Sequence, residues 1–145
     1  MLFRSVLHGK DRHQAAVTMS QQDIVIAPYS LLQRDRERWL EAKWHIVVLD
    51  EAQNIKNAST NAAQVVSQLQ TRHRLCLSGT PMENHLGELW SLFHFLMPGF
   101  LGSQKRFVSL FRTPIEKMGD TARMAQLRAR VTPFMLRRKI GRAHV

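Results

Sequence analysis

Two adjacent carboxylates, Asp50 and Glu51, directly follow an apolar run and are the residues best suited to catalysis. An aspartate at the end of a buried strand can hold a Mg²⁺ ion through water, within reach of nucleotide phosphates. A second carboxylate beside it can orient and deprotonate an attacking water. The alternative is an ordinary helix start, because acidic residues favour the first helical turn for electrostatic reasons alone. The pair by itself leaves both interpretations open.

A second polar group, Ser78, Gly79 and Thr80, follows another short apolar run. Gly79 and the following Pro81 permit a sharp turn. The two hydroxyls can then bond neighbouring carboxylates or a water linked to a phosphate. A plain strand-to-helix turn, with Asn84 capping the next helix, explains the same residues. Taken alone, this turn is a weak signal.

Short apolar segments alternate with helical ones and position both groups. The runs at 23–27, 45–49 and 74–78 are predicted as strands. Amphipathic spacing and terminating residues predict helices at 30–40, 59–69, 85–97, 102–111 and 121–131. This order predicts a parallel α/β sheet with right-handed crossovers, and chemistry in such sheets lies at the carboxyl ends of the strands. An apolar strand that stops at carboxylates is typical of a sheet covered on both faces.

Composition limits the classes of protein that this chain can belong to. It has 145 residues, of which 44% are hydrophobic, enough for one domain with a core. Trp90, Phe93 and Phe95 are predicted to belong to that core rather than to stack on bases. The single cysteine, Cys76, excludes an internal disulfide and fits a reducing compartment. The sequence also has no apolar run of membrane-spanning length and no signal peptide, so we expect a cytoplasmic chain without a membrane partner.

The charge is strongly positive and unevenly distributed. The net charge is +10, and the segment from Thr121 onward supplies +7 of it through seven cationic side chains and no acidic one. A polyanion such as nucleic acid is therefore the expected partner. The Arg-rich stretch from Arg123 to Lys139 could contact DNA phosphates. A solvated basic surface is the plain alternative.

Taken together and in this order, the two polar groups resemble motifs of a known family. The segments 49–53 and 77–80 resemble the Walker B (DEAx) and S/T-G-T motifs of superfamily-two helicase-like ATPases. Further segments resemble the Snf branch, the Swi/Snf-type DNA translocases, and bacterial members in particular. These segments are 80–84 with 88–92, Pro114-Ile115-Glu116, 133–139, and the counterparts of motifs Ia and Ib at Leu7-His8-Gly9 and Ile26-Ala27-Pro28-Tyr29. The resemblance covers nearly the whole chain.

The resemblance implies a fold, a reaction and roles for the first polar group. The fold would be a RecA-like parallel sheet of the P-loop NTPase type, with helices on both faces. The reaction would be ATP-driven translocation on duplex DNA without strand separation, with ATP and Mg²⁺ as cofactors. Asp50 would hold the Mg²⁺ through water, Glu51 would activate the attacking water, and Gln53 would sense the nucleotide.

The same resemblance assigns further residues and partners. Ser78, Gly79 and Thr80 would couple the ATP site to DNA, which the loop of Pro28, Tyr29 and Ser30 would contact. Arg137 and Arg138 would anchor the hinge between two lobes, although phosphate contacts fit these arginines equally well. The implied partners are double-stranded DNA and a DNA-bound protein complex such as RNA polymerase. The implied location is the bacterial cytoplasm, in association with the nucleoid.

Two parts of the family pattern are missing from the sequence. No phosphate-cradling glycine loop occurs, because Gly9-Lys10 is followed by Asp11 and lacks the upstream glycines. The second lobe, with its arginine finger, is also missing. We therefore expect residues 1–139 to form an incomplete first lobe with the start of the inter-lobe segment, inactive alone. Residues 140–145 depart from the family pattern and are expected to be a non-native tail.

Two alternative functions are weighed against the translocase fragment. One is a basic α/β nucleic-acid-binding module without catalysis, in which the acidic pair is only a helix cap. The other is a small P-loop kinase, which fails because the glycine loop is missing and the segment after Thr80 does not suit it. A glycine loop encoded upstream would favour the ATPase over the binding module.

Overall fold

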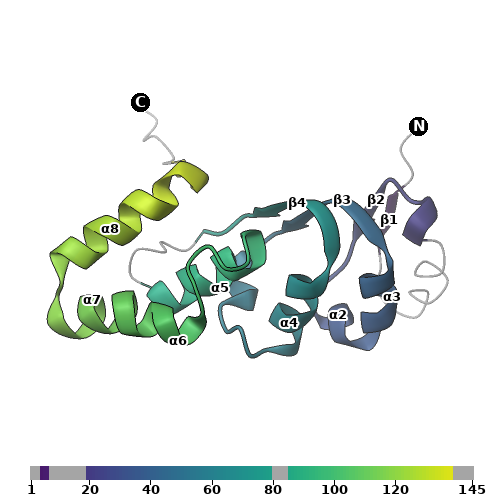
Figure 1. The fold of residues 1–145 in the computed structure, drawn as a ribbon. Coiled ribbons are helices and arrows are strands. Elements are labelled where there is room, and N and C mark those ends of the chain that lie inside the picture. Colours follow the sequence, from purple (N-terminus) through teal and green to yellow (C-terminus); the bar gives the residue numbers. More distant parts are fainter. Residues whose placement is uncertain (1–3, 7–18, 80–84, 139–145) are drawn as a thin grey trace, which may run out of the picture. The chain divides into compact units, whose positions relative to one another are not determined.

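The structure is a computed structural model that describes residues 4–6, 19–79 and 85–138 (Figure 1). Contacts divide the chain into two units, Met1–Leu101 and Gly102–Val145. The first unit contains the described strands and the helices that pack on them, and the second unit is helical. Within the described residues, no helix has the length and apolar character needed to cross a membrane.

The strands form two parallel pairs. β1 (Arg4–Val6) pairs with β2 (Ile24–Ile26), and β3 (Lys43–Leu49) pairs with β4 (Gln70–Cys76). The three predicted strands are therefore present, and each belongs to a parallel pair. Within the described residues, however, the backbone ladder does not join β2 to β3, so the predicted continuous sheet is two neighbouring pairs.

The last strand starts earlier than its sequence predicts. β4 begins at Gln70, whereas the sequence predicts a start at Arg74. The prediction missed the first residues of the strand because they are polar and lack the apolar pattern of a buried strand. Arg74 shows how a charged residue is accommodated in β4. Its guanidinium donates to the main-chain oxygens of Leu69 (2.8 Å) and Phe95 (2.9 Å). The ladder also continues beyond β4, since the Leu77 amide donates to the Leu49 carbonyl at 2.8 Å.

Helices of the first unit pack on one face of β3 and β4. They are α2 (Ser30–Arg34), α3 (Arg36–Glu41), α4 (Asn61–Gln68) and α5 (Leu86–Leu96), with short 3₁₀ turns at Met19–Gln21 and Ala52–Ile55. The helix predicted over 30–40 is interrupted at Asp35, whose φ and ψ of −110° and 29° are not helical. The Thr60 hydroxyl caps α4 by accepting from the Ala63 amide at 3.3 Å.

The core lies between these helices and the strands. Leu49, Val66 and Phe95 belong to one buried cluster, in which Val66 and Phe95 are completely buried. The Arg74 guanidinium lies over the Phe95 ring, 4.9 Å from its centre. The predicted core position of the α5 aromatic residues is confirmed, since Trp90, Phe93 and Phe95 are all buried.

The opposite face of the strands is apolar and exposed among the described residues. Alternate side chains on β2, β3, β4 and the residue after β4 are 44–55% exposed: Ile24, Ile26, Ile46, Val48, Leu75 and Leu77. Val48 lies beside Leu75 in the parallel register, so these two side chains share a face. Parallel sheets are normally covered on both faces. The predicted covering by helices is therefore present on one face of the described strands.

The second unit is built from consecutive short helices and one longer one. They are α6 (Gln104–Phe107), a π-helical turn (Val108–Arg112), α7 (Thr113–Met118), α8 (Thr121–Val131) and a 3₁₀ turn (Thr132–Phe134). α8 matches its prediction, whereas α7 was not predicted. Gly119 ends α7 with a φ of 62°, and Asp120 caps α8 by accepting from the Arg123 amide at 2.9 Å.

Candidate functional site

The acidic pair lies directly after β3 in an unusual backbone conformation. Glu51 has φ and ψ of 47° and 52°, and it is the one non-glycine residue with positive φ in the described part of the chain. This left-handed conformation costs about 1–2 kcal/mol for a residue with a Cβ atom, so contacts must maintain it. Glu51 precedes the 3₁₀ turn Ala52–Ile55, but its side chain makes no capping hydrogen bond. The geometry does not support the helix-cap interpretation of this pair.

Several hydrogen bonds hold the turn at Glu51, among them one from the Ala52 amide to the Leu77 carbonyl at 2.8 Å. The Glu51 amide donates to Asp50 Oδ1 at 2.9 Å, and Asn54 Nδ2 donates to the Glu51 main-chain oxygen at 2.8 Å. From the loop after β2, Tyr29 Oη donates to the Asp50 main-chain oxygen at 2.7 Å. Sequence reasoning missed Asn54, for which the only signal is an amide side chain three residues after Glu51. These bonds fix the peptide planes on both sides of Glu51.

A chain of side-chain hydrogen bonds joins the two predicted polar groups. Gln53 Nε2 donates to the Glu51 carboxylate, and Ser78 Oγ donates to Gln53 Oε1 at 3.1 Å. The link crosses from the end of β3 to the turn after β4. The structure therefore brings together Glu51, Gln53 and Ser78. This agrees with the expectation that residues following two neighbouring parallel strands lie at one edge of the sheet. Gly79 is exposed at the same turn, and Thr80 lies outside the described residues.

The side chains at this edge suit a magnesium ion. Asp50 and Glu51 are both exposed and offer the carboxylate oxygens that Mg²⁺ prefers. Among residues 4–6, 19–79 and 85–138, no cluster of three or more His, Cys, Asp or Glu side chains could enclose a metal. Mg²⁺ is usually held by one or two carboxylates together with waters and substrate phosphates. The donor set fits this kind of site rather than an all-protein cage.

The loop of Pro28, Tyr29 and Ser30 lies beside the acidic pair. Pro28 and Ser30 are exposed, while Tyr29 is half-buried against the core cluster. Burial raises the pKa of Tyr29 to about 12, and the nearby Cys76, Asp50 and Glu51 act in the same direction. The hydroxyl therefore keeps its proton at neutral pH and remains a donor to Asp50.

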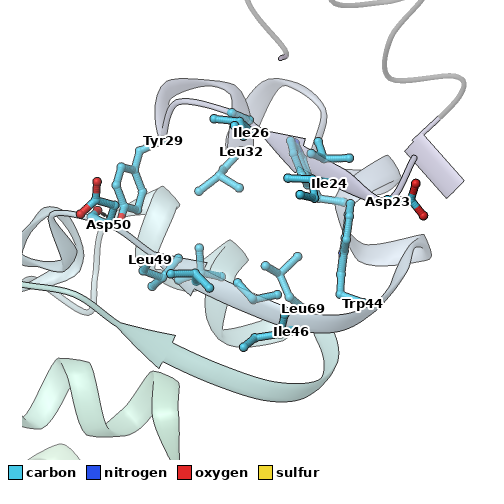
Figure 2. A pocket seen from close by; sticks show the side chains of 16 residues that line it. Asp23, Ile24, Ile26, Tyr29, Leu32, Trp44, Ile46, Leu49, Asp50 and Leu69 are labelled. Atoms are coloured by element: carbon cyan, nitrogen blue, oxygen red, sulfur yellow. Dashed lines mark hydrogen bonds between the residues drawn. The ribbon is translucent and has the colours of Figure 1, made fainter. Parts of the chain in front are cut away.

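An apolar pocket of about 510 Å³ separates β2 from β3 near this loop. Figure 2 shows Tyr29 and Asp50 at one end of the pocket and Trp44 and Asp23 at the other. The aliphatic side chains of both strands line the space between them. Tyr29 thus reaches Asp50 across a gap that no described backbone pairing bridges.

The chain matches the SNF2-related domain family over residues 2–143. It belongs to that family. The solved Sulfolobus solfataricus SWI2/SNF2 ATPase core in complex with dsDNA superposes with a TM-score of 0.87 at 43% identity, over 94% of this chain and 28% of that one. The same core domain in a second structure gives a TM-score of 0.79 at 40% identity, over 98% and 29% of the two chains. The RecA-like fold expected from the sequence is thus confirmed as that of SNF2 ATPase cores.

Curated relatives of this SNF2-related chain are much longer proteins. YwqA of Bacillus subtilis (strain 168), named as an ATP-dependent helicase/translocase, is 46% identical over 116 residues, which are 80% of this chain and 13% of YwqA. The TATA-binding protein-associated factor mot1 of Schizosaccharomyces pombe is 39% identical over 139 residues, or 88% of this chain and 7% of mot1. The chain therefore spans a small part of the relatives it matches.

The two arginines predicted at the lobe hinge belong to the second unit of this SNF2-related chain. Arg137 and Arg138 are both exposed and follow the 3₁₀ turn Thr132–Phe134. Their predicted role in anchoring two lobes, or in contacting phosphates, stays a prediction. The residues 139–145, including the proposed non-native tail, lie outside the described residues, as does the motif Ia counterpart at 7–9.

Cys76 at the end of β4 should be chemically inert in the folded SNF2-related chain. Burial raises the pKa of its thiol from the ordinary 9.0 to about 12, against the weaker opposite effect of Arg74. Because the thiolate is the reactive form, alkylation by iodoacetamide at pH 8 should be at least about tenfold slower in the folded chain than in urea. The chain has one cysteine, so its modified mass reports this site directly. Equal rates in both states would contradict the partial burial of Cys76.

Proposed function

We propose that this chain supplies the magnesium-binding and water-activating part of an ATP-dependent translocase acting on double-stranded DNA. The observation that carries the proposal is the hydrogen-bonded chain of Glu51, Gln53 and Ser78 beside Asp50. Glu51, Asp50 and Ser78 follow the ends of adjacent parallel strands, which supports their proposed roles as general base, metal ligand and coupling hydroxyl. The non-catalytic binding module explains the net charge of +10 but gives no reason for this arrangement.

The chemistry follows from how each side chain is held. Asp50 would bind Mg²⁺ through water, and the ion would neutralise charge on the phosphates of ATP. Glu51 would orient the attacking water and accept its proton, because its exposed carboxylate is fixed by Gln53. Gln53 also accepts from Ser78, so a change at the carboxylate is transmitted to the turn after β4. Gly79 and Thr80 would continue that path toward DNA.

DNA would be held mainly through its phosphates, which suits movement along any sequence. The loop of Pro28, Tyr29 and Ser30 is one proposed contact, next to the catalytic turn. The basic residues of the second unit provide a further electrostatic contribution, which is expected to weaken with salt. Arg137 and Arg138 would serve as the hinge anchor between lobes or as phosphate contacts.

The wider setting is also proposed. Residues 1–139 would be an incomplete first lobe with the start of the inter-lobe segment, and 140–145 a non-native tail. A DNA-bound protein complex, such as RNA polymerase, would be the remodelled partner in a bacterial cytoplasm, near the nucleoid. The mot1 relatives, named as TATA-binding protein-associated factors, support a protein target on DNA in general.

A chimera tests the proposed function. This chain replaces the matching segment of the Sulfolobus solfataricus SWI2/SNF2 ATPase core, to which it is 43% identical. We expect the chimera to hydrolyse ATP and to do so faster when duplex DNA is added, whereas the 145-residue chain alone should show no turnover. The unmodified core is the positive control. A chimera that binds DNA without any turnover would favour the non-catalytic binding module.

A further inference from the structure

The Tyr29 side chain connects the proposed DNA loop to the catalytic turn. Tyr29 lies in the loop after β2, and its hydroxyl donates to the main-chain oxygen of Asp50 at the end of β3. Within the described residues, β2 pairs with β1 and β3 pairs with β4, so no ladder bonds couple these two strand ends. Figure 2 shows the Tyr29 ring reaching Asp50 at one end of the intervening pocket. Displacement of the loop therefore has a direct route to Asp50.

The accepting atom matters because of the peptide to which it belongs. The Asp50 carbonyl is part of the peptide unit that leads into Glu51, whose φ of 47° is the strained feature of the site. Rotation of this peptide changes where the Glu51 carboxylate points. Two other side-chain bonds that hold the turn come from Asp50 itself and from Asn54, within the same segment. Tyr29 is the side chain that reaches this turn from the loop after β2, and the Ala52 amide joins the turn to the Leu77 carbonyl beyond β4 at 2.8 Å.

The Tyr29 side chain is held so that a shift of the 28–30 loop also shifts its hydroxyl group. Its ring is half-buried against the core cluster, and its flanking residues Pro28 and Ser30 are exposed. An aromatic ring has two side-chain torsions, so a shift of the loop backbone is carried to the hydroxyl rather than lost in side-chain rotation. The hydroxyl already has a protein acceptor at 2.7 Å, which makes it a poor candidate for a direct phosphate contact.

We infer that Tyr29 is a positioning residue that transmits DNA binding at the 28–30 loop to the Glu51 carboxylate. The inference rests on the proposed function and adds to it the route by which DNA accelerates hydrolysis. The exposed neighbours Pro28 and Ser30 receive the phosphate backbone, and the tyrosine hydroxyl moves the peptide between Asp50 and Glu51. DNA binding then changes the position of the general base without contacting it.

The test is Tyr29→Phe in the chimera, which removes the hydroxyl and keeps the ring. We expect kcat at saturating duplex DNA to fall about fivefold to tenfold, the effect of losing one hydrogen bond. The KM for ATP and the DNA concentration that gives half-maximal stimulation should stay unchanged. Thr71→Val is the matched control, since it removes a hydroxyl that donates to the His73 carbonyl at 2.9 Å, at the opposite end of β4 from Ser78. It should alter none of these quantities.

Asn54→Ala separates transmission from simple support of the turn. Asn54 holds the same turn from within its own segment, so its loss should lower turnover with and without DNA to the same extent. Tyr29→Phe should instead lower the ratio of DNA-stimulated to basal turnover. Equal ratios in the two variants would show that Tyr29 only supports the turn, and would overturn the inference.

The remaining outcomes distinguish this inference from the proposed function. A raised half-stimulating DNA concentration with unchanged kcat would make Tyr29 a direct DNA contact and overturn the inference alone. Unchanged kinetics in the Tyr29→Phe chimera would do the same. A chimera without substitutions that lacks turnover would instead refute the proposed function, and the inference with it.

Discussion

Replacing Glu51 by glutamine in the chimera should lower ATP turnover at least about a hundredfold while ATP binding is retained. General-base catalysis is worth roughly 10²–10⁴ in rate, and an amide of the same size cannot accept the proton of the attacking water. Gln53 would still be able to hydrogen-bond the new side chain, because an amide oxygen accepts as a carboxylate does. Single-turnover hydrolysis and binding of a fluorescent ATP analogue would measure the two effects separately.

A matched control for this substitution is Glu41→Gln in α3. Glu41 is also an exposed glutamate, but it lies at the end of a helix, before the start of β3 and at the opposite end of that strand from the acidic pair, and its replacement should leave turnover unchanged. Retained turnover in Glu51→Gln would remove Glu51 from the general-base role. Loss of ATP binding together with turnover would instead indicate that the left-handed turn at Glu51 had collapsed.

The strand ends could be predicted because two independent signals agree there. The apolar, β-branched run at 45–49 predicts a buried strand, and the carboxylates that follow mark its end. The same argument applies to the run that precedes Ser78. Since parallel strands bring their carboxyl ends to one edge, the contact of Gln53 with Ser78 follows from topology. The sequence therefore contained the elements of the site and their order.

The contacts that hold the turn could not be predicted in the same way. The local sequence does not indicate that Glu51 adopts a left-handed conformation, which is usually found at glycine. The Tyr29 bond joins residues that are 21 positions apart and depends on how β2 and β3, which do not pair with each other in the described part of the chain, lie beside each other. The sequence interpretation placed Tyr29 toward DNA, whereas its hydroxyl has a main-chain partner at the acidic turn.

Other differences arise where tertiary contacts override local patterns. The start of β4 is polar, so the alternation of apolar and polar residues that predicts a strand is weak there. The hydrogen bonds from the Arg74 guanidinium to the main-chain oxygens of Leu69 and Phe95 support the strand, and the sequence does not reveal them. α7, which was not predicted, has Pro114 in its first turn, where proline is well tolerated. An ion pair between Arg112 and Glu116, at 3.1 Å, spans the start of the same helix.

Phe95 joins the core to β4, the strand that leads to Ser78. Its side chain is completely buried, and the Arg74 guanidinium both covers its ring at 4.9 Å and donates to its main-chain oxygen. Burial also lowers the pKa of Arg74, so that this cation depends on its partners for compensation. Removing the ring would therefore leave a cavity and weaken the support of a partly buried charge.

Phe95→Ala should lower the free energy of unfolding of the 145-residue chain by about 3–5 kcal/mol, measured by urea denaturation. Domains are typically stable by roughly 5–15 kcal/mol, so this loss would consume much of the total. Phe134→Ala is the control, because Phe134 is 54% exposed and its loss should have a much smaller effect. Similar losses in both variants would contradict the central place of Phe95 in the core. A large loss confined to Phe95→Ala would show that the strand leading to Ser78 is held in register by the packing beneath it, before any nucleotide binds.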